Sequence, residues 1–412
     1  MNIGVISTRL AGTDGVSLES AKLVTIAKQF GHNVFYCAGE LDPDLKRQGL
    51  EDSRLHFEDE VAKELHDRAF VAKETAVTLL PDIEKRAAEL KRPLHQFLTQ
   101  YQIDTVIIQN AFAIPMQLPL AQALAELMAE LKLPGLAHNH DFYWERPRFL
   151  NSHITQFLDQ FFPPNLPDLN HAVINSLAQT ALKQRRRLNS FIIPNVFDFH
   201  TPPPGIDDFN ADFRQAIGLS DEDWLILQPT RVIPRKGIEL AIELLHRLND
   251  SRTKLIITHK AGDEGTAYLH ELETLAQAKN VDLRYVADQV DDQRRAGAGQ
   301  KTYSLWDAYP HADLVTYPSF IEGFGNALIE TVYFRLPAVV NRYPVYAADI
   351  GPLGFQFAEI DGEITSGTVE MVRGWLEDPE TAVPTTTHNY ELGKKHFSYQ
   401  TLKTLLAPMW QR

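Results

Sequence analysis

Hydrophobic positions along the chain form short apolar runs that alternate with stretches of helical spacing. Residues 2–7 make one such run, and residues 33–38 make the next. Gly31 ends the helix predicted between them. Its expected buried face consists of Leu18, Ala21, Val24, Ala27 and Phe30. The chain therefore opens with a predicted strand–helix–strand unit.

The same alternation continues through the first half of the chain. The polar stretch 41–92 is predicted to be mainly helical. Beyond it we expect strands at 105–109, 136–138, 171–176 and 191–194, with helices at 117–131 and 177–188. Strands that alternate with helices are typical of a parallel sheet covered on both faces.

The pattern restarts after residues 199–212, a segment with three consecutive prolines that is typical of an exposed linker. The second half predicts strands at 224–228, 254–258, 281–286, 313–317 and 338–340, with helices at 237–248 and 267–278. We predict an α/β protein of two doubly wound, Rossmann-like domains that face each other across a cleft, 1–200 and 201–396. Such sheets bind ligands at the carboxyl ends of their strands.

Composition and charge narrow the class of protein. A chain of 412 residues with 44% hydrophobic and 23% charged residues is long enough for two folded domains. Its net charge of -14 argues against a nucleic-acid partner. Cys37 is the single cysteine, which excludes an intrachain disulfide and a cysteine zinc site. Neither a signal peptide nor a membrane span is predicted, so we expect a cytoplasmic protein without stable membrane insertion.

A glycine-rich loop at 318–325 is the most informative stretch. A predicted strand ends at Tyr317, Glu322 lies in the loop, and Gly325 precedes a helix that carries Glu330, predicted to lie about two turns into that helix. Backbone N–H groups at such a loop can cradle an anion or a polyol. Two glutamates eight residues apart are weak evidence alone, and the strand–turn–helix context makes them specific.

Two cations follow the strand at 224–228. Arg231 and Lys236 lie between that strand and the next helix, where they can neutralise a diphosphate. Arg235 is predicted to face solvent, because neighbouring side chains of an extended chain point apart.

Two histidines mark the end of the strand at 136–138. His138 and His140 lie on the same side of an extended chain, and the spacing leaves open which one faces a ligand. A metal site at this pair lacks a third ligand nearby. In the first loop, Gly12, Gly15 and the later Glu40 offer a dinucleotide-binding alternative, but the glycine spacing is wrong for it.

The segments EGFGNALIE and RVIPRK resemble the E-x7-E and R-x4-K motifs of family 4 glycosyltransferases, which have the GT-B fold. The resemblance implies a retaining enzyme that needs no cofactor or metal and takes a nucleotide sugar as donor. Catalytic residues would then be Arg231, Lys236, His140 and Glu322. Donor-binding residues would be Gly15, Gly323, Phe324, Gly325, Asn326, Ala327, Glu330, Val286 and Ala287. Acceptor-binding residues would be Asp14, His138, Asp141, Trp144, Arg342 and Tyr343.

Further segments resemble the same family. PNVFDFH, at 194–200, is similar to the family's segment between domains, and a helix at about 397–412 is expected to cross back to the first domain. AGTDGVS, HNHDFYWER and VNRYPVY are most similar to the subgroup of mannosylglucosylglycerate synthases. This implies transfer of a hexose from GDP-mannose or from UDP- or GDP-glucose to a small polar acceptor of the glucosylglycerate type.

Other classes of enzyme remain open at this point. A membrane-surface glycosyltransferase that acts on a lipid or glycan acceptor would need a basic face, for which Lys183, Arg185, Arg186 and Arg187 are the sequence's only run. A glycosyl phosphorylase shares the fold. The two DxD sequences, at 42–44 and 221–223, lack a sugar-binding context and are interpreted as chance. The oligomeric state is not predicted.

Overall fold

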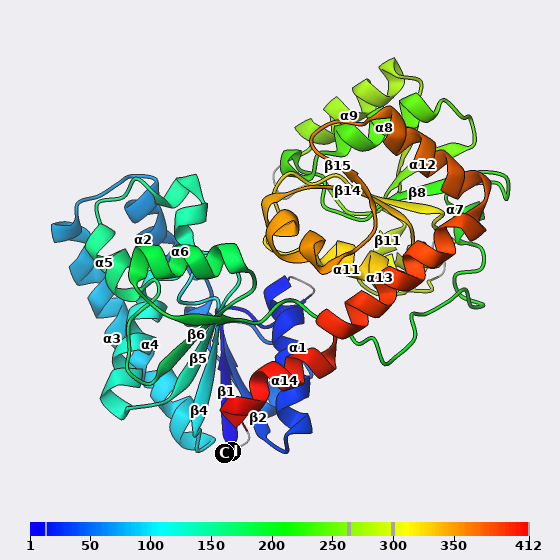
Figure 1. Cartoon of the computed structure of the whole chain (residues 1–412). Helices are drawn as coiled ribbons and strands as arrows, with labels where there is room; N and C mark the ends of the chain where they lie inside the picture. The colour runs from blue at the N-terminus through cyan, green and yellow to red at the C-terminus, as the bar shows by residue number, and fades with distance from the viewer. Residues whose placement is uncertain (13–14, 262–264, 298–300, 411–412) are drawn as a thin grey trace. The chain divides into compact units, whose positions relative to one another are not determined.

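The computed structural model describes residues 1–12, 15–261, 265–297 and 301–410 (Figure 1). The chain divides into two compact units. Unit 1 comprises Met1–Val196 with Leu402–Arg412, and unit 2 comprises Phe197–Thr401.

Unit 1 is built on a seven-stranded parallel sheet with the strand order β3-β2-β1-β4-β5-β6-β7. The strands are β1 (Asn2–Ile6), β2 (Asn33–Ala38), β3 (Gly49–Glu51), β4 (Thr105–Gln109), β5 (Gly135–Asn139), β6 (Leu169–Val173) and β7 (Ser190–Ile192). The chain order reverses between β1 and β4, which are hydrogen-bonded neighbours. Ligands of doubly wound sheets bind at such a reversal.

Helices cover both faces of this sheet (Figure 1). They are α1 (Gly15–Gln29), α2 (Glu60–Phe70), α3 (Ala76–Gln100), α4 (Leu118–Leu131), α5 (Thr155–Phe161), α6 (Ser176–Arg186) and the C-terminal α14 (Tyr399–Trp410). Buried side chains of α2 to α6 share one hydrophobic core with β1, β2 and β4 to β6. The end of α14 packs on unit 1 through Trp410, which contacts Phe30 and His32 edge to face.

The predicted buried face of α1 is only partly right. Leu18 is 41% exposed and Ala21 is exposed, whereas Leu23 and Ile26 are buried together with Val24 and Ala27. A repeat of three residues falls short of the 3.6-residue helical turn, so the predicted stripe winds around the helix instead of following one face. The edge strand β3 is also missing from the prediction, because only three residues form it within a polar stretch.

Unit 2 repeats the architecture with a six-stranded parallel sheet in the order β10-β9-β8-β13-β14-β15. Its strands are β8 (Trp224–Gln228), β9 (Thr253–Ile257), β10 (Asp282–Tyr285), β13 (Leu314–Tyr317), β14 (Ala338–Asn341) and β15 (Ala358–Ile360), and β11 (Val290–Asp291) pairs separately with β12 (Tyr303–Ser304). Its helices are α7 (Phe213–Ala216), α8 (Ile238–Leu248), α9 (Ala267–Ala278), α10 (Leu305–Ala308), α11 (Asn326–Tyr333), α12 (Ser366–Glu377) and α13 (Val383–His396). The chain order reverses between the neighbours β8 and β13.

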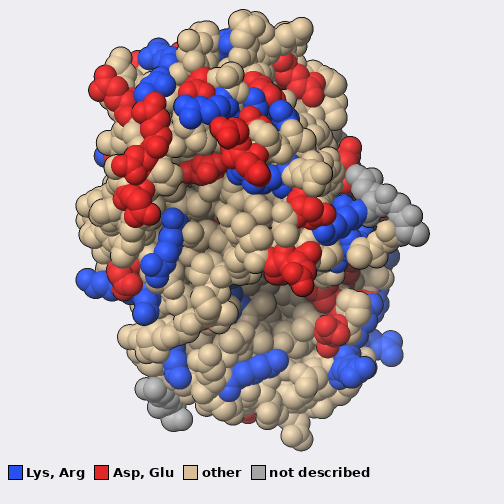
Figure 2. Space-filling view, turned by 90° about the vertical axis from the view of Figure 1, so that its right-hand side faces the viewer, with Lys and Arg blue, Asp and Glu red and all other residues tan. Residues whose placement is uncertain are grey.

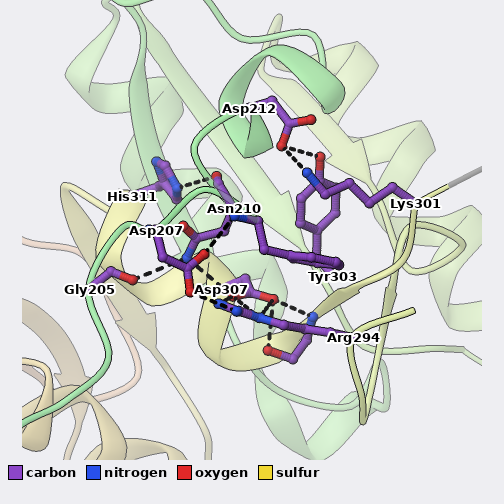
Figure 3. A network of polar contacts seen from close by, with 11 residues as sticks. Gly205, Asp207, Asn210, Asp212, Arg294, Lys301, Tyr303, Asp307 and His311 are labelled. Atoms are coloured by element: carbon purple, nitrogen blue, oxygen red, sulfur yellow. Dashed lines mark hydrogen bonds and ion pairs between the residues drawn. The ribbon is translucent and has the colours of Figure 1, made fainter. Parts of the chain in front are cut away.

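The proline-rich segment is fastened to unit 2 by a polar network (Figure 3). Arg294 pairs with Asp207 at 2.7 Å and also contacts Asp307. Asn210 is fully buried, and its side-chain amide donates to Asp307 at 3.2 Å. Asp212 accepts from Lys301 and from the Tyr303 hydroxyl. Although most of residues 201–212 are exposed, their carboxylates and amides attach the segment to one unit.

The charged residues of the surface are mixed in sign. Figure 2 shows acidic and basic side chains interspersed over the face that it presents. Among the helices that the structure describes, none is long and apolar enough to cross a bilayer.

Candidate active site

Charged side chains of unit 2 gather where β8 and β13 end side by side. The segment after β8 carries Arg231 and Lys236, and the segment after β13 carries Glu322. Parallel neighbours place their carboxyl ends at one edge of the sheet, so residues almost ninety positions apart meet there. Three of the predicted catalytic residues thus follow the two strands at which the chain order reverses.

Lys236 and Glu322 form an ion pair in which each side chain is only 9% exposed. Burial alone would raise the pKa of Glu322, but the charges of Lys236 and Arg235 and the hydrogen bonds to the carboxylate together outweigh burial, so the pKa lies below its ordinary value. The ammonium group of Lys236 also lies 5.8 Å from the centre of the Tyr317 ring. Removing both charges of such a pair from water costs free energy, so the pair is weak evidence for a role in stability. This favours a role in function instead.

Arg235 is partly exposed, but its side chain does not point away from Lys236 as the sequence predicted. Its guanidinium donates to the carbonyl oxygen of Ile321 at 2.8 Å and to the Glu322 carboxylate at 3.4 Å. The reason is the local backbone, because Pro234–Lys236 forms a 3-10 turn instead of an extended chain. Consecutive side chains of such a turn are not directed to opposite sides, so Arg235 and Lys236 both reach Glu322.

The glycine-rich loop approaches its neighbours closely at Gly325. This residue has a φ of +127°, and a Cβ atom built on it would lie 2.4 Å from the Tyr343 hydroxyl. Tyr343 is buried, and its hydroxyl donates to the carbonyl oxygen of Phe324 at 2.7 Å. Phe324 itself packs edge to face on Phe397. Glycine is therefore required at 325, and Tyr343 contacts the loop from its buried side.

The remaining predicted donor residues lie around the same edge. Glu330 is about one turn into α11, not two, because the helix begins only at Asn326. Its carboxylate accepts from the Tyr309 hydroxyl at 2.8 Å. Val286 and Ala287 directly follow β10 and are buried. Gly323 is exposed, and Asn326 and Ala327 are partly buried. Arg342, predicted on the acceptor side, pairs with Glu359 at 2.6 Å.

The histidines of unit 1 share one amide. Gln109, the last residue of β4, is buried. The oxygen of its side-chain amide lies 3.0 Å from Nδ1 of His138 and 3.4 Å from Nε2 of His140. His138 is 2% exposed, whereas His140 is only partly buried. Burial, together with nearby His140, lowers the pKa of His138 well below its ordinary value. Of the two, His140 has the more accessible side chain.

The loop after the histidines is held by Asn110. This residue adopts a left-handed backbone with a φ of 57°, and its side chain accepts from the backbone N–H of His140 and donates to Asp141. Asp141 also pairs with Arg146. Trp144 stacks on Phe142 and belongs to the hydrophobic core of unit 1, so it packs inside rather than lining a surface.

The first loop is described only in part. Gly15 begins α1 and is exposed. Asp14, predicted to contact the acceptor, lies outside the described residues. In the basic run at the end of α6, Lys183, Arg185 and Arg187 are exposed and Arg186 is partly buried. Arg186 pairs with Asp159, Lys183 donates to the side chain of Asn189, and Arg185 lies over Trp144.

Four residues of these sites were missed by the sequence interpretation. Gln109 and Asn110 could have been found, because they are polar residues placed directly at the carboxyl end of a predicted strand. The sequence around Tyr309 contains no motif that would have indicated a site. His259 follows β9, and burial, with the charge of Lys236 added, lowers its pKa to about 4. Within the described residues, no group of three or more His, Cys, Asp or Glu side chains is arranged to hold a metal ion.

Comparison with known proteins identifies relatives of the whole chain. Residues 209–357 match the family model described as "Glycosyl transferases group 1". The chain is 31% identical to the mannosylglucosylglycerate synthase of Petrotoga mobilis over 87% of this chain and 86% of the relative. It is 30% identical to that of Thermotoga maritima over 99% of both. The crystal structure of Anabaena HepE with UDP and glucose covers 99% of both chains with a TM-score of 0.65 and 14% identity.

The two parallel α/β units and the structural similarity define the GT-B fold. With relatives at this identity along almost its full length, the chain belongs to the group 1 (family 4) glycosyltransferases, within which it is similar to mannosylglucosylglycerate synthases.

Proposed function

We propose that the protein is a retaining hexosyltransferase that moves a hexose from a nucleoside-diphosphate sugar to a small polar acceptor of the glucosylglycerate type. The observation that carries the proposal is the buried Lys236–Glu322 pair beside a glycine-rich loop where the sheet order reverses. The names of the two relatives at about 30% identity support the class of acceptor and favour mannose as the hexose.

The residues of the two sites have separate roles. Arg231 and Lys236 stabilise the negative charge that develops on the leaving diphosphate. Glu322 and the loop amides from Gly323 to Ala327 bind hydroxyl groups of the hexose, and Glu330 binds the ribose. Val286 and Ala287 contact the base. In unit 1, His140, with His138 and Asp141 beside it, contacts the sugar and the acceptor.

In the reaction, the bond between the anomeric carbon and the diphosphate oxygen breaks as the acceptor hydroxyl attacks from the same face. The hydroxyl proton passes to the leaving diphosphate oxygen, so no protein side chain is assigned as general base. The products are the glycoside and the nucleoside diphosphate. Two cations beside the leaving group supply the charge compensation that a metal ion gives in other transferases, and we propose that no metal is required.

The test is a panel of GDP-mannose, GDP-glucose and UDP-glucose, each offered with glycerate, glucosylglycerate, a free disaccharide and a lipid acceptor in vesicles. We expect a product one hexose heavier with glucosylglycerate, with the anomeric configuration of the donor retained in its NMR spectrum and full activity in EDTA. An inverted product or loss of activity in EDTA would contradict the mechanism. Transfer only to the vesicle acceptor, or release of a sugar 1-phosphate that depends on phosphate, would replace the proposed function.

A further inference from the structure

Arg235 has no role in the function proposed so far, yet its side chain is joined to the same loop. It donates to the backbone carbonyl of Ile321 and to the carboxylate of Glu322, and its own carbonyl accepts from the backbone N–H of Phe320 at 2.9 Å. One residue thus makes side-chain and backbone contacts with three consecutive residues of the loop. These contacts connect the turn after β8 with the loop after β13.

The turn and the loop also touch at Gly237. A Cβ atom there would lie 2.5 Å from the carbonyl oxygen of Pro318, so the two backbones approach as closely as glycine permits. Arg235 therefore acts on a loop whose first residues are already fixed. The contact that it adds is the one at Ile321 and Glu322, which are the residues just before the glycines.

Glu322 has two cationic partners that differ in burial. Lys236 is 9% exposed, whereas the Arg235 side chain is 35% exposed. Because Lys236 is assigned to the diphosphate, its contact with Glu322 is not available to orient the carboxylate for the hexose. Arg235 keeps its contact with the carboxylate, and its planar fork also holds the Ile321 carbonyl, which fixes the direction of Glu322.

We propose that Arg235 is a positioning residue that holds Glu322 and its loop in place for the hexose when Lys236 engages the diphosphate of the donor. This inference rests on the proposed function, since it assumes that Glu322 binds the hexose and Lys236 the diphosphate. It assigns Arg235 to the sugar part of the donor, through Glu322, and not to the phosphates.

The experiment compares affinity for a nucleotide sugar with affinity for its nucleoside diphosphate. GDP-mannose against GDP, and UDP-glucose against UDP, are titrated into the full chain by calorimetry. In Arg235→Gln we expect affinity for the nucleotide sugar to fall about tenfold, as for loss of one charged hydrogen bond, while affinity for the diphosphate changes less than about twofold. Arg235→Lys keeps the charge without the fork, and its loss should be intermediate.

Arg247 supplies a matched control. It also pairs with a glutamate, Glu243, at 2.7 Å and donates to a backbone carbonyl, that of Ile364, at 2.6 Å. Arg247→Gln removes the same kinds of contact from unit 2 away from the loop. We expect it to change neither affinity, with a thermal unfolding temperature similar to that of Arg235→Gln.

Each other outcome has a distinct meaning. If Arg235→Gln lost affinity equally for the nucleotide sugar and for the nucleoside diphosphate, Arg235 would act on the phosphates, and the inference would be overturned. Unchanged affinities for both ligands would also overturn the inference. A wild-type chain that binds none of the four nucleotides would overturn the proposed function and the inference with it. If the wild type binds the nucleotides but Arg235→Gln loses no more affinity for the nucleotide sugar than for the diphosphate, only the inference is overturned.

Discussion

The two units present polar groups of different kinds at the carboxyl ends of their strands. In unit 2, the ends of β8 and β13 bring together fixed charges, with Lys236, Arg235 and Glu322 in direct contact. In unit 1, the ends of β4 and β5 bring together Gln109 and two histidines, which interact through an amide oxygen. The one cluster is ionic, and the other consists mainly of neutral hydrogen-bonding groups.

This difference suits two different ligands. A dianion such as a diphosphate is bound by fixed cations, whose attraction is strong where water is excluded. A ligand rich in hydroxyl groups is distinguished by the geometry of hydrogen bonds, which carry little net energy but are costly when left unpaired. We therefore expect substitutions in unit 2 to affect use of the donor and those in unit 1 to affect use of the acceptor.

The largest expected effect is that of Lys236→Met. Loss of the cation should lower the rate of transfer by about 10²- to 10³-fold, as for other groups that stabilise charge in the transition state. Lys279 pairs with Glu243 at 2.7 Å elsewhere in unit 2 and serves as the control, so Lys279→Met should retain near wild-type turnover. Transfer assays at saturating donor and acceptor check this. Near-normal activity of Lys236→Met would contradict the claim that cations of unit 2 stabilise the leaving diphosphate.

A smaller effect is expected from Gln109→Leu. The substitution leaves both histidines without their shared acceptor, and misplacement of His140 should lower turnover by about ten- to a hundredfold. Affinity for the nucleoside diphosphate, measured by calorimetry, should stay at the wild-type value, because Arg231 and Lys236, to which the diphosphate is assigned, lie in unit 2. Gln122→Leu is the control, since Gln122 is also a buried glutamine of unit 1 but bonds only within α4, to Glu126 at 2.7 Å. A loss of affinity for the diphosphate in Gln109→Leu would contradict the separate roles of the two units.

The smallest expected effect concerns stability toward acid. Burial lowers the pKa of His171 in unit 1 to about 4, whereas an unfolded histidine has a pKa of about 6.5. Between these values the unfolded chain binds the extra proton, so stability should fall as pH drops from 6.5 toward 4. We expect the unfolding temperature of His171→Asn to fall less over this range than that of the wild type. Parallel curves for the two proteins would show that His171 is not the group responsible.

Much of the fold could be predicted because buried parallel strands are continuous apolar runs. Strands β2, β4 and β8 and helix α9 have the predicted bounds. The short strands β3 and β15 escaped prediction, since three residues give no periodicity. The buried side of α1 was assigned correctly at Val24 and Ala27 but wrongly at Leu18 and Ala21, because the sequence offers apolar residues on more than one face of that helix.

The candidate site of unit 2 was easier to predict than that of unit 1. Charged residues beside glycines form a pattern that stands out along the sequence, and the structure brings Lys236 and Glu322 together. Arg235 was misjudged because its direction depends on a single 3-10 turn. Gln109 was overlooked because its partners lie about thirty residues further along the chain, and only strand pairing brings them together.

The order in which the ribosome makes the chain gives the C-terminal helix a further consequence. Phe30 and His32 are made before unit 2, but their partner Trp410 appears only after all of unit 2 has been synthesised. Unit 1 therefore leaves the ribosome incomplete, with apolar surface uncovered while its neighbour folds. A fragment that stops at residue 196 would keep this defect permanently, whereas a circular permutant that begins with α14 would deliver the helix first.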